Sequence, residues 1–123
     1  MNAAQRPRVL MAEDEACLAF ALQDLLDDAG YEVVPARRLA DVVRALDGGD
    51  DIALAILDIN LDGDFVYPIV PRLRERGVPI VFASAYDTRA IPAEYRDERI
   101  LQKPYDPALL LSTLAALLPA RTG

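Results

Sequence analysis

The sequence contains no histidine, and it has a single cysteine among its 123 residues. Without histidine, the chain lacks the usual general base, the usual imidazole metal ligand and any site for a phosphohistidine. The chain is therefore neither a histidine kinase nor a histidine phosphotransfer protein. Cys17 has no partner for an internal disulfide, which fits a reducing cytoplasm. We interpret its side chain as packing within a helix.

Long apolar runs are also missing from the chain. No run approaches the roughly 18 residues that a membrane span needs. The first residues have no apolar stretch after Arg6 and Arg8, so they do not form a signal peptide. The net charge of −7 disfavours binding to the phosphate backbone of nucleic acid. These absences predict a cytoplasmic protein that binds neither membranes nor nucleic acid.

The composition that remains is that of a globular protein. Hydrophobic residues make up 53% of the chain and charged residues 27%, which excludes a disordered polypeptide. The length corresponds to a single domain, residues 1–123, whose core we place at about residues 7–119.

Short apolar runs alternate along the chain with residues at helical spacing. Strands are predicted at residues 8–12, 31–35, 52–57, 78–83 and 99–102, and helices around 18–29, 39–46, 66–73 and 110–117. Asp106 and Pro107 are typical of the cap and first turn of a helix. Residues 87–97 contain Pro92 and lack a helical period, so we expect a short or irregular fourth helix there. The alternation predicts a parallel sheet with helices on both faces.

Polar residues stand at the end of four of the predicted strands. Glu13 and Asp14 follow the first strand, Asp58 the third, Ser84 the fourth and Lys103 the fifth. Carboxyl ends of parallel strands form the ligand-binding edge of an open sheet. Three clustered carboxylates repel one another, and a hard divalent cation such as Mg²⁺ relieves that repulsion. With a lysine and a hydroxyl beside it, an Asp nucleophile has the parts needed for phosphoryl transfer onto a carboxylate.

Each of these residues taken alone has a more ordinary explanation. The acidic pair is typical of a turn that caps a helix, Asp58 and Ser84 of turn residues, and Lys103 of a solvated surface charge. The functional interpretation is favoured because all of them lie at strand ends of one sheet, in a compatible order.

Four segments containing these residues resemble the receiver domains of bacterial two-component response regulators. The segments are Met-Ala-Glu-Asp-Glu at 11–15, Ile-Leu-Asp-Ile-Asn at 56–60, Phe-Ala-Ser-Ala at 82–85 and Lys-Pro-Tyr at 103–105. The resemblance covers nearly the whole chain. It implies a flavodoxin-like, doubly wound α/β domain with a five-stranded parallel sheet in the order 2-1-3-4-5.

The resemblance also implies a role for each site residue. Asp58 corresponds to the phosphoacceptor, and Glu13 and Asp14 to the acidic pair that organises Mg²⁺, with Mn²⁺ as an alternative ion. Asn60 would supply a backbone carbonyl to the metal. Ser84 corresponds to the switch hydroxyl, and Lys103 to the family's lysine, followed by a cis bond to Pro104.

The segment from Phe82 to Tyr86 narrows the resemblance further. It is similar to the single-domain subfamily named for its Phe-Ala-Thr-Gly-Tyr motif, with Ser84 in place of Thr and Ala85 in place of Gly. The serine keeps the hydroxyl, whereas the alanine gives up backbone freedom. Many receivers carry an aromatic switch residue where this chain has Ile100. Tyr86 and Tyr105 are candidate substitutes for that residue, with simple packing as the alternative for both.

The implied function is that of a stand-alone response regulator. It would accept a phosphoryl group from a histidine kinase or phosphotransfer protein, catalyse its own Mg²⁺-dependent phosphorylation, and dephosphorylate slowly. Output would pass by contact with an unidentified downstream protein, because no effector domain follows residue 123, and a homodimer is compatible with this function.

Three alternatives stay open. A phosphatase with an Asp nucleophile needs an acid two residues after it, where this chain has Asn60. A pseudo-receiver without chemistry is disfavoured by the complete set of site residues. A fragment of a larger protein is disfavoured by the initial Met.

Overall fold

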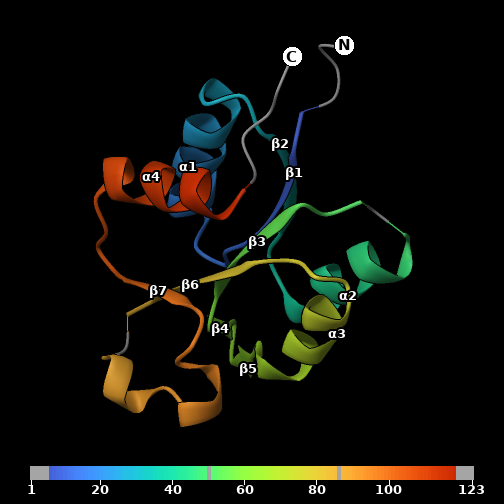
Figure 1. The fold of residues 1–123 in the computed structure, drawn as a ribbon, viewed down its shortest axis with the longest axis vertical. Coiled ribbons are helices and arrows are strands. Elements are labelled where there is room, and N and C mark those ends of the chain that lie inside the picture. Colours follow the sequence, from blue (N-terminus) through green and yellow to red (C-terminus); the bar gives the residue numbers. More distant parts are fainter. Residues whose placement is uncertain (1–5, 50, 86, 119–123) are drawn as a thin grey trace.

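The computed structural model describes residues 6–49, 51–85 and 87–118. Its main sheet has five parallel strands in the order β2-β1-β3-β6-β7 (Figure 1). The strands are β1 Arg8–Ala12, β2 Glu32–Ala36, β3 Leu54–Asp58, β6 Ile80–Ser84 and β7 Arg99–Gln102. Since β6 and β7 are the fourth and fifth strands of this sheet, the predicted order is confirmed. No helix in the described part of the chain is long and apolar enough to cross a membrane.

Helices cover both faces of the sheet. They are α1 Ala16–Asp28, α2 Leu39–Asp47, α3 Val70–Glu75 and α4 Pro107–Leu117. Figure 1 shows α1 and α4 on one side of the sheet and α2 and α3 on the other. One core cluster joins the sheet to α1 and α4, and the other joins it to α2 and α3. Strands β1 and β3, in the middle of the sheet, are therefore buried on both sides, which explains their nearly unbroken apolar sequences.

Side chains at the helix ends decide where α1 and α4 begin. The Glu15 carboxylate accepts hydrogen bonds from the backbone N–H groups of Cys17 and Leu18, so Glu15 caps α1. Asp106 caps α4 by accepting from Ala108 N–H at 3.0 Å, with Pro107 in the first turn, as predicted. The interpretation of Cys17 as a packing residue is wrong, because its side chain is exposed on the first turn of α1.

The connection from β3 to α3 contains structure that the sequence pattern does not reveal. A small hairpin follows β3 and consists of β4 Asn60–Leu61 and β5 Asp64–Phe65. A 3-10 turn, η1 Tyr67–Ile69, then leads into α3. The prolines at 68 and 71 each occupy a first-turn position, where a missing N–H costs little.

The connection from β6 to β7 confirms the expected irregular fourth helix. It contains two single 3-10 turns, η2 Thr88–Ala90 and η3 Ala93–Tyr95. The Arg96 side chain ties the two turns together by donating to the carbonyl of Ile91 at 2.8 Å and to that of Arg89 at 3.1 Å.

Candidate functional site

The parallel register brings the predicted site residues to one edge of the sheet. Ala12 pairs with Leu57, so Glu13 and Asp58, the next residues along, lie side by side. Asp58 pairs with Ala83, which places Ser84 one position beyond it on β6. Lys103 directly follows β7, and its N–H donates to the Ser84 carbonyl at 2.7 Å. The peptide bond from Lys103 to Pro104 is cis, as expected.

Lys103 is the electrostatic centre of this edge. It is the only lysine in the chain, among 13 basic residues. Its Nζ lies 2.7 Å from Glu13 Oε1 and 3.0 Å from Asp58 Oδ2. Burial alone would lower the pKa of the Lys103 ammonium, but the hydrogen bonds to the two carboxylates outweigh burial and raise that pKa above its ordinary value. The ammonium therefore stays charged at neutral pH and bridges two strands.

Glu13 is the buried member of the acidic group. Its side chain is 4% exposed, and burial raises its pKa above the ordinary value. Hydrogen bonds from the Lys103 ammonium and the Glu15 N–H offset that effect in part. The Lys103 ammonium therefore favours the ionised form of this buried carboxylate.

The three carboxylates could hold a metal ion. One oxygen from each of Glu13, Asp14 and Asp58 can be chosen so that all three lie within 4.8 Å of one another. Their burial is graded, from buried Glu13 through half-buried Asp58 to exposed Asp14. A set of carboxylate oxygens that opens to solvent on one side suits Mg²⁺, which keeps several of its waters.

The β4–β5 hairpin supplies three further polar contacts at this edge. The Asn60 N–H points to Asp58 Oδ1 at 3.4 Å, and the Asn60 side-chain oxygen accepts from Gly63 N–H at 2.7 Å. The backbone N–H of Asp62 donates to Asp14 Oδ2 at 2.8 Å. Asp62 is absent from the residues predicted from sequence, because its contribution is a backbone group. The Asp-Gly turn that presents this N–H was the available signal.

The structure separates the three switch candidates. The Ser84 side chain is completely buried at the end of β6. Tyr105 is half-buried, and burial raises the pKa of its phenol. Tyr86 lies outside the described residues. Ile100 pairs with Phe82 and packs on the core cluster shared with α2 and α3, so this position holds an aliphatic packing residue.

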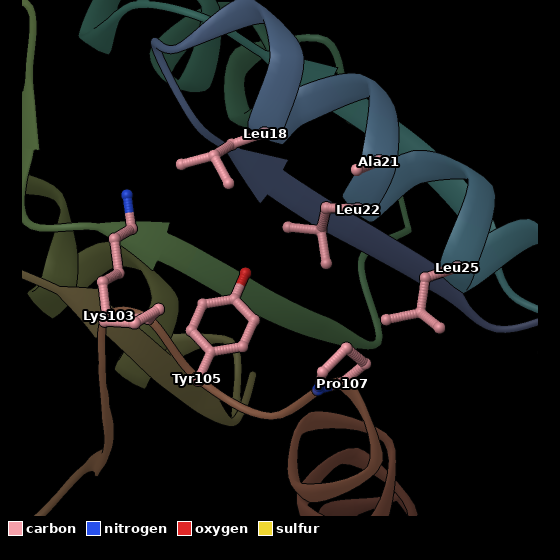
Figure 2. A pocket seen from close by; sticks show the side chains of 8 residues that line it. Leu18, Ala21, Leu22, Leu25, Lys103, Tyr105 and Pro107 are labelled. Carbon is pink, nitrogen blue, oxygen red and sulfur yellow. The ribbon is translucent and has the colours of Figure 1, made fainter.

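An apolar cleft of about 540 Å³ adjoins the charged edge. It lies between α1 and the segment that follows β7, and Figure 2 shows the α1 side chains facing Tyr105 and Pro107 across it. The lining residues are Leu18, Ala21, Leu22, Leu25, Lys103, Pro104, Tyr105 and Pro107. Lys103 lines the cleft and also contacts the carboxylates, so the two features are continuous.

Comparisons with known proteins agree with this geometry. The family model described as the response regulator receiver domain matches residues 9–115. The uncharacterized transcriptional regulatory protein YbdJ of Bacillus subtilis is 28% identical over 94% of this chain and 52% of its own length. The aerobic respiration control protein ArcA of Escherichia coli is 30% identical over 84% of this chain and 44% of its own length. The chain thus spans about half the length of these curated relatives.

Two solved structures are similar over nearly their full length. SdrG from Sphingomonas melonis is 31% identical, with a TM-score of 0.78, over 95% of this chain and 98% of that one. A response regulator receiver protein from Sinorhizobium medicae is 28% identical, with a TM-score of 0.83, over 97% of this chain and 99% of that one.

Proposed function

This chain belongs to the response regulator receiver domain family of two-component signal transduction, and we propose that Asp58 accepts a phosphoryl group from a histidine kinase or histidine phosphotransfer protein. The observation that carries the proposal is the Lys103 ammonium, held 3.0 Å from Asp58 Oδ2 by its second bond to Glu13. A positive charge fixed at this point can bind an oxygen of the arriving phosphoryl group without rearranging.

In the proposed reaction, an oxygen of the Asp58 carboxylate forms a bond to phosphorus. The bond from phosphorus to the donor's imidazole nitrogen breaks, and its electron pair stays on nitrogen. Mg²⁺ bound by Glu13, Asp14, Asp58 and the Asn60 carbonyl would neutralise charge on the phosphoryl oxygens. Lys103 holds one of these oxygens, and the Ser84 hydroxyl donates a hydrogen bond to another.

We assign binding of the phosphodonor protein to the apolar cleft beside Lys103. Leu18, which lines the cleft, is 44% exposed on α1, although a helix stripe ordinarily buries such a residue against the core. A partner that covers the cleft would exclude water from the adjacent carboxylates. This position therefore fits the phosphodonor better than a downstream target.

We also propose that the chain acts as a stand-alone regulator of the Phe-Ala-Thr-Gly-Tyr type. Support comes from the segment Phe82-Ala83-Ser84-Ala85 and from SdrG, whose chain is matched over 98% of its length. A structure described as the BeF3-activated conformation of SdrG is 32% identical to this chain. Beryllofluoride is therefore a suitable mimic of the phosphorylated state in experiments on this chain.

Labelling with acetyl phosphate and Mg²⁺ tests the proposal. We expect intact-mass analysis to show one added phosphoryl group, labile to base and absent from Asp58→Asn. Asp51→Asn, which removes an exposed carboxylate elsewhere, should be labelled like the parent. Equal labelling of Asp58→Asn would refute the assignment. Mg²⁺ binding without labelling would favour a pseudo-receiver. Repeated hydrolysis of acetyl phosphate without accumulation of labelled protein would favour a phosphatase.

A further inference from the structure

The hairpin that follows Asp58 ends in a tight turn with unusual backbone angles. Asn60 pairs with Phe65 and Leu61 with Asp64, so Asp62 and Gly63 form a two-residue turn. Their φ angles are +53° and +94°. Positive φ at both central residues is the mark of a type I′ turn, for which Asp-Gly is among the favoured pairs.

This turn directs a backbone N–H at the acidic group. The Asp62 N–H donates to Asp14 Oδ2 at 2.8 Å, across 48 positions of sequence. One residue further, the Gly63 N–H donates to the Asn60 side-chain oxygen at 2.7 Å. The Asn60 side chain thus accepts a hydrogen bond within the hairpin that closes the turn. The turn itself donates a hydrogen bond to Asp14, which lies outside the hairpin.

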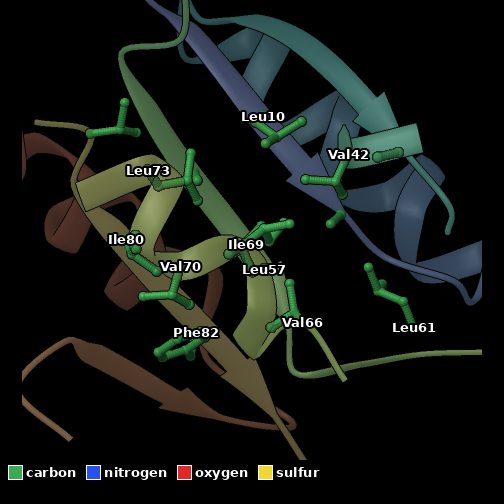
Figure 3. Close-up of a cluster of buried hydrophobic side chains, with 14 of the residues drawn as sticks. Leu10, Val42, Leu57, Leu61, Val66, Ile69, Val70, Leu73, Ile80 and Phe82 are labelled. Atoms are coloured by element: carbon green, nitrogen blue, oxygen red, sulfur yellow. The ribbon is translucent and has the colours of Figure 1, made fainter. Parts of the chain in front are cut away.

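The base of the hairpin is fixed to the core. Leu61 and Val66 are completely buried, and Figure 3 shows both among the side chains of the cluster that α2 and α3 cover. The Val66 N–H also donates to the Ile59 carbonyl at 2.8 Å. The core therefore holds the base of the hairpin in place, and the conformation of the Asp62-Gly63 turn sets the position of the Asp62 N–H.

Asp14 needs such support more than the other two acids. Glu13 and Asp58 are both held by Lys103, whereas the Asp14 side chain is exposed. Glu15, not Asp14, caps α1. An exposed carboxylate samples several rotamers, and binding a metal in one of them costs side-chain entropy. A hydrogen bond to one oxygen reduces that cost and leaves the other oxygen available.

We propose that the side chain of Asn60 is a positioning residue for the metal site: it closes the Asp62-Gly63 turn, and the turn orients the Asp14 carboxylate. This role rests on the proposed function and is separate from the backbone carbonyl of Asn60, which every substitution keeps. Groups that orient metal ligands typically contribute about 10- to 100-fold in metal affinity.

Titration calorimetry with Mg²⁺ on the full chain, well below its melting temperature, tests the proposal. Asn60→Ala should bind Mg²⁺ about tenfold more weakly than the parent. Asn60→Asp keeps the side-chain oxygen and should bind at least as tightly as the parent. Asp64→Asn is a matched control, since it removes a carboxylate of the same hairpin, and its affinity should stay within about twofold. Parent-like affinity in Asn60→Ala, or weak binding in Asn60→Asp, overturns the proposal.

A second measurement in EDTA separates this role from general stability and from the proposed function. Hydrogen exchange of the Asp62 amide should be faster in Asn60→Ala than in the parent, with a melting temperature lowered by only a few degrees. Unchanged Asp62 exchange overturns the positioning role. Absence of Mg²⁺ binding by the parent refutes the metal site of the proposed function instead, and the EDTA result still decides whether Asn60 fixes the turn.

Discussion

Two connections leave the functional edge of the sheet, and they are built in opposite ways. Residues 59–69, after β3, bury Ile59, Leu61 and Val66 completely and add a hydrogen-bonded hairpin. Among the described residues 87–98, after β6, Ile91 alone is buried. The first connection shares the core of the domain, whereas the second buries one side chain fully and packs Tyr95 against the edge of the core.

An aromatic stack joins the two connections. The Tyr67 ring lies parallel to that of Tyr95, with 4.5 Å between centroids, and its edge meets Phe82 at 6.3 Å. Arg74 on α3 covers Tyr95 and pairs with Glu98 at 2.8 Å. Phe82 is two residues before Ser84, so a change at the end of β6 has a packed route to the second connection.

The difference predicts where a phosphorylation signal can act. Segments with few buried apolar contacts open at low free energy, whereas segments inside the core open only with global unfolding. A coupling free energy of about 1–3 kcal/mol is enough to remodel a weakly packed segment, but not a segment that is part of the core. We therefore expect residues 87–98 to respond to the state of Asp58, and the hairpin to keep its shape.

Alanine substitution of one side chain in each connection should give the largest difference in the free energy of unfolding. Leu61→Ala empties a fully buried position and should lower the free energy of unfolding by about 3 kcal/mol. Thr88→Ala, on the exposed turn η2, should change it by less than about 0.5 kcal/mol. Urea denaturation with a common slope measures both. Similar losses in the two variants would show that the connections are equally integrated.

Lys103 links the two connections. It follows β7, which comes after the second connection, and it contacts Glu13 and Asp58, which lie beside the first. Lys103→Met should lower the free energy of unfolding at pH 8 by about 2 kcal/mol, below the cost of breaking a fully buried ion pair. The raised pKa of the folded ammonium means that its stabilising effect is complete below pH 10.5, the ordinary value, and is lost as pH rises through the higher folded value.

A pH series of urea denaturation measures this effect. The parent should lose stability above pH 10.5 by more than Lys103→Met does. Both proteins should carry Tyr105→Phe in this comparison, because burial raises the pKa of that phenol and the Lys103 charge lowers it. The chain has no other lysine, so no second lysine ammonium contributes to the difference between the two profiles. Identical pH profiles for the two proteins would mean that Lys103 does not stabilise the edge.

Hydrogen exchange with and without beryllofluoride and Mg²⁺ addresses the smallest expected effect. Amides of residues 87–98 should exchange about tenfold more slowly with the mimic, which corresponds to about 1.4 kcal/mol. Amides of residues 61–66 should change by less than about twofold. Asp58→Asn should show neither response. Unchanged exchange in residues 87–98, with changes confined to α4, would contradict this role.

The sequence by itself determined which side chains meet at one edge of the sheet, and its resemblance to receiver domains supplied the strand order. Parallel strands place their carboxyl ends at one edge, so the order of Glu13, Asp58, Ser84 and Lys103 along the chain was sufficient to predict their meeting. Local backbone chemistry likewise fixed the cap at Asp106 and the irregular segment around Pro92.

The tertiary structure decided the features that depend on distances between elements. Helical period predicts an apolar face on α1, but not that Leu18 would border an open cleft or that Cys17 would be exposed. The bond from Asp62 N–H to Asp14 joins a backbone group to a carboxylate 48 positions away. Every residue except proline carries such an N–H, so side-chain identity does not indicate which one meets a partner. Only the packing of the hairpin against the core brings that group to Asp14.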